Sequence, residues 1–177
     1  MRGGGEFTNV VGRAIYLDNN ATTQPLPEVI EAVAEAMSLG PTNPSSLHDA
    51  GRYARNALAQ ARAQAAVMVG ADESDVIFTS GATEANNIVL LSLLGHLSGH
   101  RLVTSVVEHS SIIETAGFLE RQGVPVTLLP VDENGLISEH SLAGAIVPGK
   151  TLVSIQWANN ETGVIQPIKR LASVARA

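Results

Sequence analysis

Residues 76–87, with the sequence VIFTSGATEANN, decide how the rest of the chain is interpreted. The first three residues are β-formers in a short apolar run, which predicts a strand covered on both faces. Ser80 is a candidate helix N-cap, and Gly81 has no Cβ to obstruct a sharp turn. The stretch therefore predicts a buried strand over 76–78, a glycine-containing turn and the start of a helix.

The turn in this stretch is a candidate anion site. The first amides of a helix lack intrahelical acceptors and lie at the positive end of the helix dipole, which suits a phosphate group. Thr83 is placed to add a hydroxyl donor. An ordinary capped turn between a strand and a helix explains the same residues, because the more specific glycine-rich phosphate patterns are absent. On these residues alone, both interpretations stay open.

The composition narrows the classes of protein. The chain has 177 residues, 45% hydrophobic and 16% charged, which is enough for one domain with a proper core. A net charge of −6 argues against a nucleic-acid or anionic-membrane partner. Cysteine is absent from the sequence, so this chain supplies no disulfide, no thiolate metal ligand and no cysteine nucleophile.

Two segments bear on location. Residues 1–13 lack the apolar stretch of a signal peptide and are typical of a flexible leader or a cloning scar. Residues 88–94 are the most apolar segment, and they are far shorter than the roughly 20 residues that a membrane-spanning helix needs. We therefore expect a cytoplasmic protein without a membrane partner.

Strand-forming and helix-forming segments alternate along the chain. Strands are expected over 76–78, 102–107, 126–129 and 152–157, and helices over 25–39, 47–69, 84–97, 110–122, 138–145 and from 167 onward. This alternation predicts an α/β fold with a mainly parallel sheet and flanking helices. The first helix is expected to bury one apolar stripe, formed by Val29, Ile30, Val33, Ala36 and Met37.

Polar clusters follow three of the predicted strands, and ligands of open parallel sheets bind beyond the carboxyl ends of the strands. The clusters are 80–83, 108–109 and 159–160. A phosphate cradle, the His109 imidazole and the Asn160 carboxamide on one edge suit a flat, phosphorylated heteroaromatic ligand. His109 is a candidate for ring stacking or proton transfer. Structural roles stay open, because such a histidine is commonly a hydrogen-bonded residue and asparagines commonly shape turns.

Other constellations are weaker. His96 and His100 have the spacing of helical metal ligands, but Gly99 lies between them and no third ligand is near. The His-Ser-Ser run at 109–111 lacks the nucleophile-elbow pattern of serine hydrolases. The arginines of the long second helix are expected to form a solvated face, made by Arg52, Arg55 and Arg62.

The motifs of the chain, taken in order, resemble those of cysteine desulfurases of the nitrogen-fixation and iron–sulfur assembly type. These belong to the class V aminotransferase group of pyridoxal-phosphate (PLP) enzymes. The resemblance runs from Tyr16 to the last residue. Each motif is weak alone, whereas their order and spacing are specific. The motifs are 16–23 (YLDNNATT), 40–48 (GPTNPSSLH), 78–84 (FTSGATE), 107–109 (VEH), 130–132 (PVD) and 157–163 (WANNETG).

The resemblance implies a PLP-dependent transferase fold of type I, with residues 14–177 as the N-terminal segment and first half of its large domain. It implies that Ala82 and Thr83 bind the PLP phosphate, that His109 stacks on the pyridine ring and assists proton transfer, and that Asn160 hydrogen-bonds near the ring hydroxyl and the substrate. Such enzymes are homodimers that take sulfur from L-cysteine as a persulfide for an acceptor protein and release alanine.

Other family features are expected beyond Ala177, so the sheet should be incomplete at the C-terminus. They are the aspartate on the pyridine nitrogen, the Schiff-base lysine, the sulfur-accepting cysteine and the substrate-binding arginine. Neither lysine of this chain, Lys150 or Lys169, is where an aldimine is expected, so PLP contacts should be non-covalent. Three interpretations stay open: part of an active desulfurase completed by a C-terminal chain, an inert fragment or binding module, or part of a selenocysteine lyase or other class V enzyme.

Overall fold

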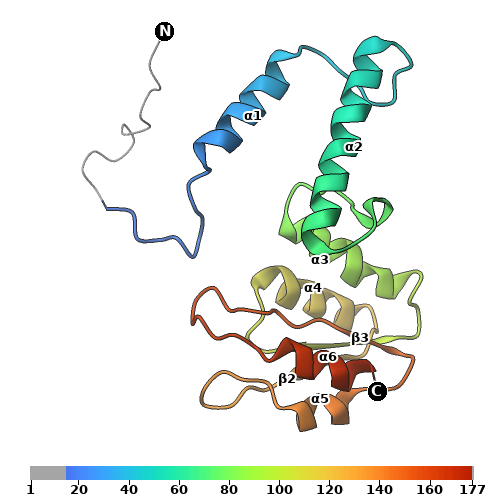
Figure 1. Ribbon diagram of the computed structural model, residues 1–177. Coiled ribbons are helices and arrows are strands. Elements are labelled where there is room, and N and C mark those ends of the chain that lie inside the picture. The colour runs from blue at the N-terminus through green and yellow to red at the C-terminus, as the bar shows by residue number, and fades with distance from the viewer. Residues whose placement is uncertain (1–14, 177) are drawn as a thin grey trace. The chain divides into compact units, whose positions relative to one another are not determined.

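The computed structural model describes residues 15–176 (Figure 1), in two units that comprise residues 1–40 and 41–177. The leader predicted over 1–13 lies outside the described residues. In the first unit the described regular element is helix α1, Pro27–Ser38, which has proline at its start. None of its residues is buried, and Val33 is 53% exposed. The predicted buried stripe is therefore wrong, because an amphipathic helix buries its stripe only where another element covers it.

The second unit begins with the long helix α2, Asp49–Val69, followed by a 3₁₀ turn, η1, at Glu73–Asp75. The Nδ1 atom of His48 caps the helix by accepting the Gly51 N–H at 3.3 Å. The helix ends at Gly70, whose φ of +68° is a left-handed conformation that favours glycine. The predicted helix over 47–69 is confirmed, with a start two residues later.

The arginines of α2 are ordered by partners of the same unit. Arg55 donates to two carbonyl oxygens of the preceding loop, at 2.8 and 2.9 Å. Arg52 forms an ion pair with Asp49. Arg52 and Arg55 are exposed, as predicted, whereas Arg62 is half-buried and lies 5.6 Å from the centroid of the Phe78 ring. The predicted solvated face therefore does not extend to Arg62.

A three-stranded parallel sheet organises the remainder of this unit. Its strands are β1, Arg101–Ser105; β2, Val126–Leu129; and β3, Thr151–Val153. Their order is β2-β1-β3, so the earliest strand is the central one. Leu102 is the register partner of both Val126 and Leu152. The predicted α/β fold with a parallel sheet is confirmed.

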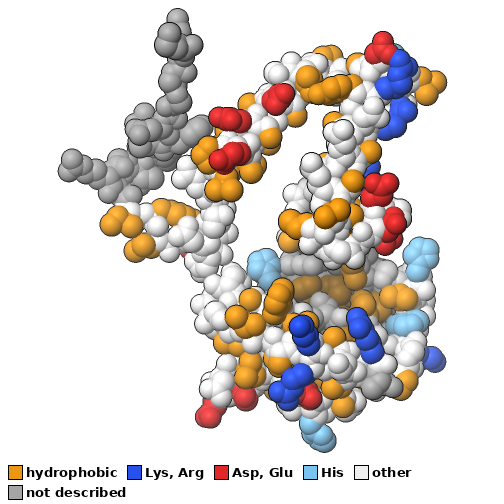
Figure 2. Space-filling model, in the orientation of Figure 1, with side chains coloured by type: hydrophobic (Ala, Val, Ile, Leu, Met, Phe, Trp, Pro, Cys, Tyr) orange, Lys and Arg blue, Asp and Glu red, His pale blue; other side chains and the backbone are white. Residues whose placement is uncertain are grey.

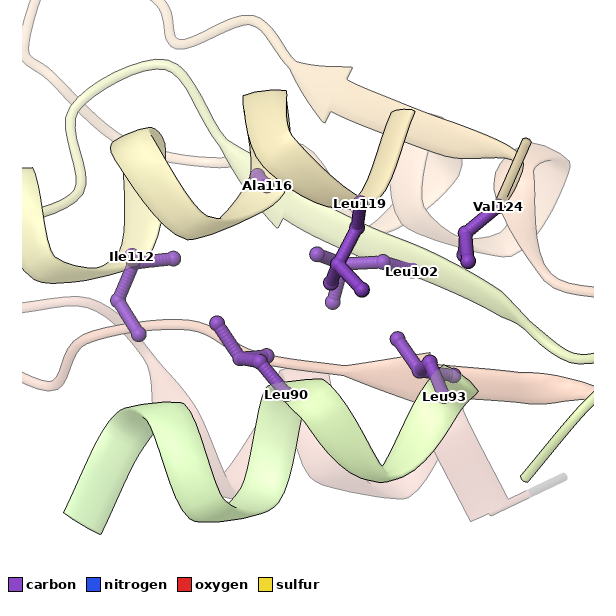
Figure 3. Packing of buried hydrophobic residues seen from close by; sticks show 7 residues of the cluster. All are labelled: Leu90, Leu93, Leu102, Ile112, Ala116, Leu119 and Val124. Carbon is purple, nitrogen blue, oxygen red and sulfur yellow. The ribbon is translucent and has the colours of Figure 1, made fainter. Parts of the chain in front are cut away.

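Helices flank the sheet on both faces (Figure 1). They are α3, Ala82–Leu91; α4, Ser110–Arg121; α5, Glu139–Ala145; and α6, Ile168–Arg176. Successive strand residues point to opposite faces. Leu102 accordingly packs with residues of α3 and α4 (Figure 3), whereas Val103 packs with residues of α5 and α6. The two hydrophobic cores therefore meet at neighbouring residues of β1.

The strand predicted over 76–78 is not formed. The backbone at Val76 is extended, but these residues take part in none of the described sheet pairings. Ile77 is 73% exposed and Phe78 is 48% exposed, so the run is not buried either. A run of β-formers becomes a strand only where a neighbouring strand accepts and donates its backbone hydrogen bonds, and the local sequence cannot supply that neighbour.

Several element ends differ from the prediction because the backbone changes partner. The Ser154 N–H still donates to β1, at Val103 O, but the Gln156 N–H donates to the Glu108 carboxylate, so β3 stops at Val153. The apolar helix predicted over 84–97 ends as α3 at Leu91, and a 3₁₀ turn, η2, follows at Ser92–Leu94. The remaining predicted helices and strands are confirmed to within a few residues.

Large hydrophobic side chains also reach the surface of the second unit. Figure 2 shows hydrophobic side chains among the charged ones on the visible face. Val67, Met68, Ile77 and Trp157 are each more than 70% exposed. Large apolar side chains that are this exposed are candidates for contact with another chain. Within residues 15–176, no helix combines the length and the apolar character that crossing a bilayer requires.

We predict that Thr104→Val raises the free energy of unfolding by about 1 kcal/mol. The Thr104 side chain is fully buried in β1, and its hydroxyl has no hydrogen-bond partner among the described residues, so the isosteric valine removes an unpaired polar group. Thr115→Val is the matched control, because the Thr115 hydroxyl is also buried but donates to Asn87 Oδ1 at 2.9 Å. Urea unfolding should show opposite signs for the two variants. A destabilised Thr104→Val protein would contradict the prediction.

Candidate functional site

Hydrogen bonds join the three segments that the sequence assigned to one sheet edge. Helix α3 is tied to the start of α4, where Asn86 Nδ2 donates to Ser111 Oγ at 2.9 Å. The loop after β3 is tied to the loop after β1, where Asn159 Nδ2 donates to Val107 O at 3.0 Å. The start of α4 directly follows the loop after β1, so the regions around Thr83, His109 and Asn160 belong to one bonded assembly at the carboxyl edge of the sheet.

The first turn of α3 has uncovered amides. Its N-cap is Gly81, so the predicted cap at Ser80 is wrong, and the Ser80 N–H instead donates to the Glu84 carboxylate at 2.6 Å. Among the described residues, the backbone N–H groups of Ala82, Thr83 and Glu84 have no hydrogen-bond acceptor, because the first bond of the helix comes from Ala85. These amides are the donors that an anion at a helix N-terminus uses.

The space beside Gly81, the N-cap of α3, is open. A Cβ atom built on Gly81 would meet nothing within 4 Å, and the φ of Gly81, 163°, is extended backbone that any residue adopts. Neither the neighbouring protein atoms nor the backbone conformation therefore requires glycine at position 81, contrary to expectation. Open space beside three unpaired donors fits the phosphate group of PLP, so the residues present suit the cofactor that the sequence resemblance implies.

Glu84 sets the local charge at this end of α3. Hydrogen bonds from the Ser80 hydroxyl and the Ser80 N–H lower the pKa of this exposed carboxyl. The ionised side chain also lies in the first turn, where a negative charge is favoured by the helix dipole. A phosphate at the same amides therefore meets a carboxylate that belongs to the same helical turn.

His109 has the structural role that the sequence left open, and it also keeps an exposed ring. It is the N-cap of α4, and its Nδ1 atom accepts the Ser111 N–H at 3.1 Å. No partner of Nε2 is found among the described residues. The ring therefore uses one nitrogen to start the helix and leaves the other for solvent or a ligand.

Asn159 and Asn160 also differ in their structural roles. Asn159 shapes the turn, since its Oδ1 accepts the N–H groups of Glu161 and Thr162 at 2.9 and 2.8 Å. Its Nδ2 group holds the turn against Val107 O. Asn160, the neighbour predicted to face a ligand, is exposed on this fixed turn.

Glu108 is a neighbour of the candidate site whose hydrogen bonds the sequence analysis did not predict. Its carboxylate accepts the Ser105 hydroxyl at 2.8 Å and the Gln156 N–H at 3.0 and 3.1 Å. Burial raises the pKa of the Glu108 carboxyl, although the bonds from Gln156 and Ser105 oppose the shift. The carboxylate thus links the chain after β1 to the chain after β3, and the two residues Glu108 and Gln156 lie 48 positions apart. No local motif signals a pairing over that separation.

We predict that Glu108→Gln reduces the loss of stability between about pH 4 and pH 7. Because the folded-state pKa of Glu108 is raised, its contribution is fully present below the unfolded value of about 4.3 and is lost as the pH rises through the folded-state pKa. Glutamine stays neutral and still accepts the Gln156 N–H. Urea unfolding at both pH values measures the difference.

Glu108→Ala is the contrasting variant. It leaves the Gln156 N–H without this acceptor and should lower the unfolding free energy by about 1 kcal/mol at either pH. An unchanged pH dependence in Glu108→Gln would show that the carboxylate is not disfavoured by burial.

Comparisons with known proteins identify the family of the chain. The family model of class-V aminotransferases matches residues 15–177. A protein named cysteine desulfurase IscS from Methanosarcina thermophila is 40% identical over 174 residues, which are 97% of this chain and 43% of that relative. Cysteine desulfurase 2 of Trichormus variabilis is 44% identical over 163 residues, 92% of this chain and 41% of the relative.

Solved structures show the same backbone. A structure titled "SspA in complex with cysteine" superposes with a TM-score of 0.84 at 38% identity, over 90% of this chain and 47% of that chain. DndA from Streptomyces lividans superposes with a TM-score of 0.77 at 37% identity, over 92% of this chain and 46% of that one. The chain thus spans less than half the length of these relatives.

Proposed function

The chain belongs to the class-V aminotransferase family, and on that premise we propose that it is the N-terminal part of a PLP-dependent cysteine desulfurase. The relatives named cysteine desulfurase support this substrate class. The observation that carries the proposal is the set of uncovered amides at the start of α3. Asn86 of the same helix is hydrogen-bonded to α4, the helix that His109 caps. Residues 14–177 would then be the N-terminal segment and first half of the PLP-binding domain.

Each site residue has a proposed role toward the cofactor. PLP, when bound, supplies an electron sink for bonds at the substrate α-carbon. The amides of Ala82 and Thr83 would hold its phosphate, with the Thr83 hydroxyl as a further donor. The His109 ring would cover the pyridine face and assist proton transfer, and Asn160 would donate to the ring hydroxyl and contact the substrate. These contacts are non-covalent.

The positions of the lysines support the non-covalent assignment. Lys150 directly precedes β3 and therefore lies at the amino end of the sheet, whereas the site residues follow the carboxyl ends of β1 and β3. Lys169 is the second residue of α6. Neither lysine belongs to the segments that the site hydrogen bonds join. The lysine that holds PLP covalently would come from another part of the complete enzyme.

The proposed reaction converts L-cysteine to alanine and passes the sulfur, as a persulfide, to an acceptor protein for iron–sulfur cluster assembly or other sulfur transfer. The complete enzyme would act as a homodimer, which would also cover apolar surface such as that at Trp157. Alanine release from L-cysteine and from L-selenocysteine, measured on protein purified from its natural source with PLP bound, tests the activity. Faster release of alanine from L-selenocysteine than from L-cysteine would indicate a selenocysteine lyase instead of a cysteine desulfurase.

We predict that this chain binds pyridoxine 5′-phosphate at least about tenfold more tightly than pyridoxine, because only the phosphate ester engages the α3 amides. Neither compound has an aldehyde, so lysines cannot capture them covalently. Isothermal titration calorimetry measures both affinities. Equal affinities for the two compounds would show that the α3 amides do not bind the phosphate group.

Thr83→Val is the matched variant for the same titration. It keeps the amides and removes the hydroxyl donor, and it should weaken binding of the phosphate ester by roughly fivefold while leaving pyridoxine unchanged. Thr115→Val removes a hydroxyl from α4 that lies outside the proposed cradle and serves as the control. A Thr83→Val loss that is equal for both compounds would place Thr83 away from the phosphate.

A further inference from the structure

The hydrogen bonds of His109 determine which ring nitrogen carries the proton. A backbone N–H can only donate, so Nδ1, which accepts the Ser111 N–H at 3.1 Å, holds a lone pair and no hydrogen. In the neutral ring the proton is then on Nε2. The hydrogen bond that caps α4 therefore also fixes the tautomer of His109.

A second donor on Nδ1 comes from a buried hydroxyl. Ser111 Oγ lies 2.9 Å from Nδ1, and since Nδ1 has no hydrogen the hydroxyl must be the donor. Ser111 Oγ in turn accepts from Asn86 Nδ2 at 2.9 Å. Ser111 is 7% exposed, whereas the His109 ring is exposed. The order of donation runs from the half-buried Asn86 through the buried Ser111 to Nδ1 of the exposed His109.

Asn87 and Thr115 form another hydrogen bond between α3 and α4, and this one does not involve the His109 ring. Thr115 lies one turn after Ser111 and is equally buried. Its single hydroxyl hydrogen is shared between two acceptors, Asn87 Oδ1 at 2.9 Å and Ser111 O at 3.0 Å. This pair joins α3 to α4 and has no bond to His109. It therefore separates the effect of helix packing from an effect on the imidazole.

We infer that Asn86 and Ser111 are positioning residues that hold His109 as its Nε2–H tautomer and fix the direction of the ring. The consequence for the site rests on the proposed function. A ligand that approaches the exposed nitrogen meets a hydrogen-bond donor instead of a lone pair. The ring accepts a proton only by giving up the hydrogen bond at Nδ1 that caps α4.

The test is long-range ¹H–¹⁵N NMR on the uniformly labelled 177-residue chain, at a pH where the imidazoles are neutral. The two ring nitrogens of each tautomer have well-separated ¹⁵N shifts, and His109→Gln assigns the signal among the five histidines. We expect the Nε2–H form of His109 to predominate over a measurable minority of the Nδ1–H form. Equal populations of the two tautomers, or an excess of the Nδ1–H form, in the unsubstituted protein would overturn the inference.

Two variants at Ser111 test the hydroxyl. Ser111→Ala removes the second donor and should raise the ratio of the Nδ1–H to the Nε2–H form of His109 about fivefold, whereas Ser111→Thr restores the hydroxyl and should return the ratio toward its original value. Asn86→Ala should act in the same direction by a smaller factor, and it tests the inference independently if Ser111→Ala fails to fold. Thr115→Val should leave the ratio unchanged. An unchanged ratio in Ser111→Ala and Asn86→Ala would overturn the assignment.

Titration with pyridoxine 5′-phosphate separates this inference from the proposed function. If the tautomer ratio shifts in Ser111→Ala while affinity for the ligand is unaltered, the positioning role holds and the proposed contact between His109 and the ligand fails. If affinity falls in Ser111→Ala with no shift in the ratio, the positioning role fails and the ligand contact holds.

Discussion

The two hydrogen-bonded ladders of β1 constrain the sheet and both hydrophobic cores of the second unit. β1 is the one described strand with a neighbour on each side, and its residues alternate between the core shared with α3 and α4 and the core shared with α5 and α6. Because Leu102 and Val103 are fully buried in opposite directions, a register change by one residue would exchange both cores at once. The direction in which the chain leaves β1, and hence the position of His109, follows from this register.

Beyond the ladders, the carboxyl edge is held by side chains. Glu108 is partly buried and is hydrogen-bonded by neutral donors, namely the Ser105 hydroxyl and the Gln156 N–H. No ion pair to this carboxylate is described within residues 15–176. Neutral donors hold a carboxylate in a defined direction without a mobile cationic side chain. The turn at Asn159 and the cap at His109 thus share one rigid support.

The sequence predicted those features that depend on local periodicity. The alternation of strands and helices, the parallel sheet and the helices after β1 and β2 are all present. The Ser80 cap is a local error, because Gly81 caps α3 and the Ser80 N–H donates to Glu84, four residues later. The strand over 76–78 and the buried stripe of α1 each required a partner that is not encoded nearby. The interactions that define the site have the same character, since Asn86 and Ser111 are 25 positions apart and no repeating pattern marks them.

The strand order also has a consequence for the growing polypeptide. The central strand is made first, and β2 and β3 then add to its two sides in the order in which they leave the ribosome. Each ladder therefore needs only residues that have already been synthesised, which suits folding during translation. The Glu108 carboxylate likewise waits for Gln156, which comes shortly after β3. The support for His109 is consequently completed once β3 has been made, before α6 closes the second core.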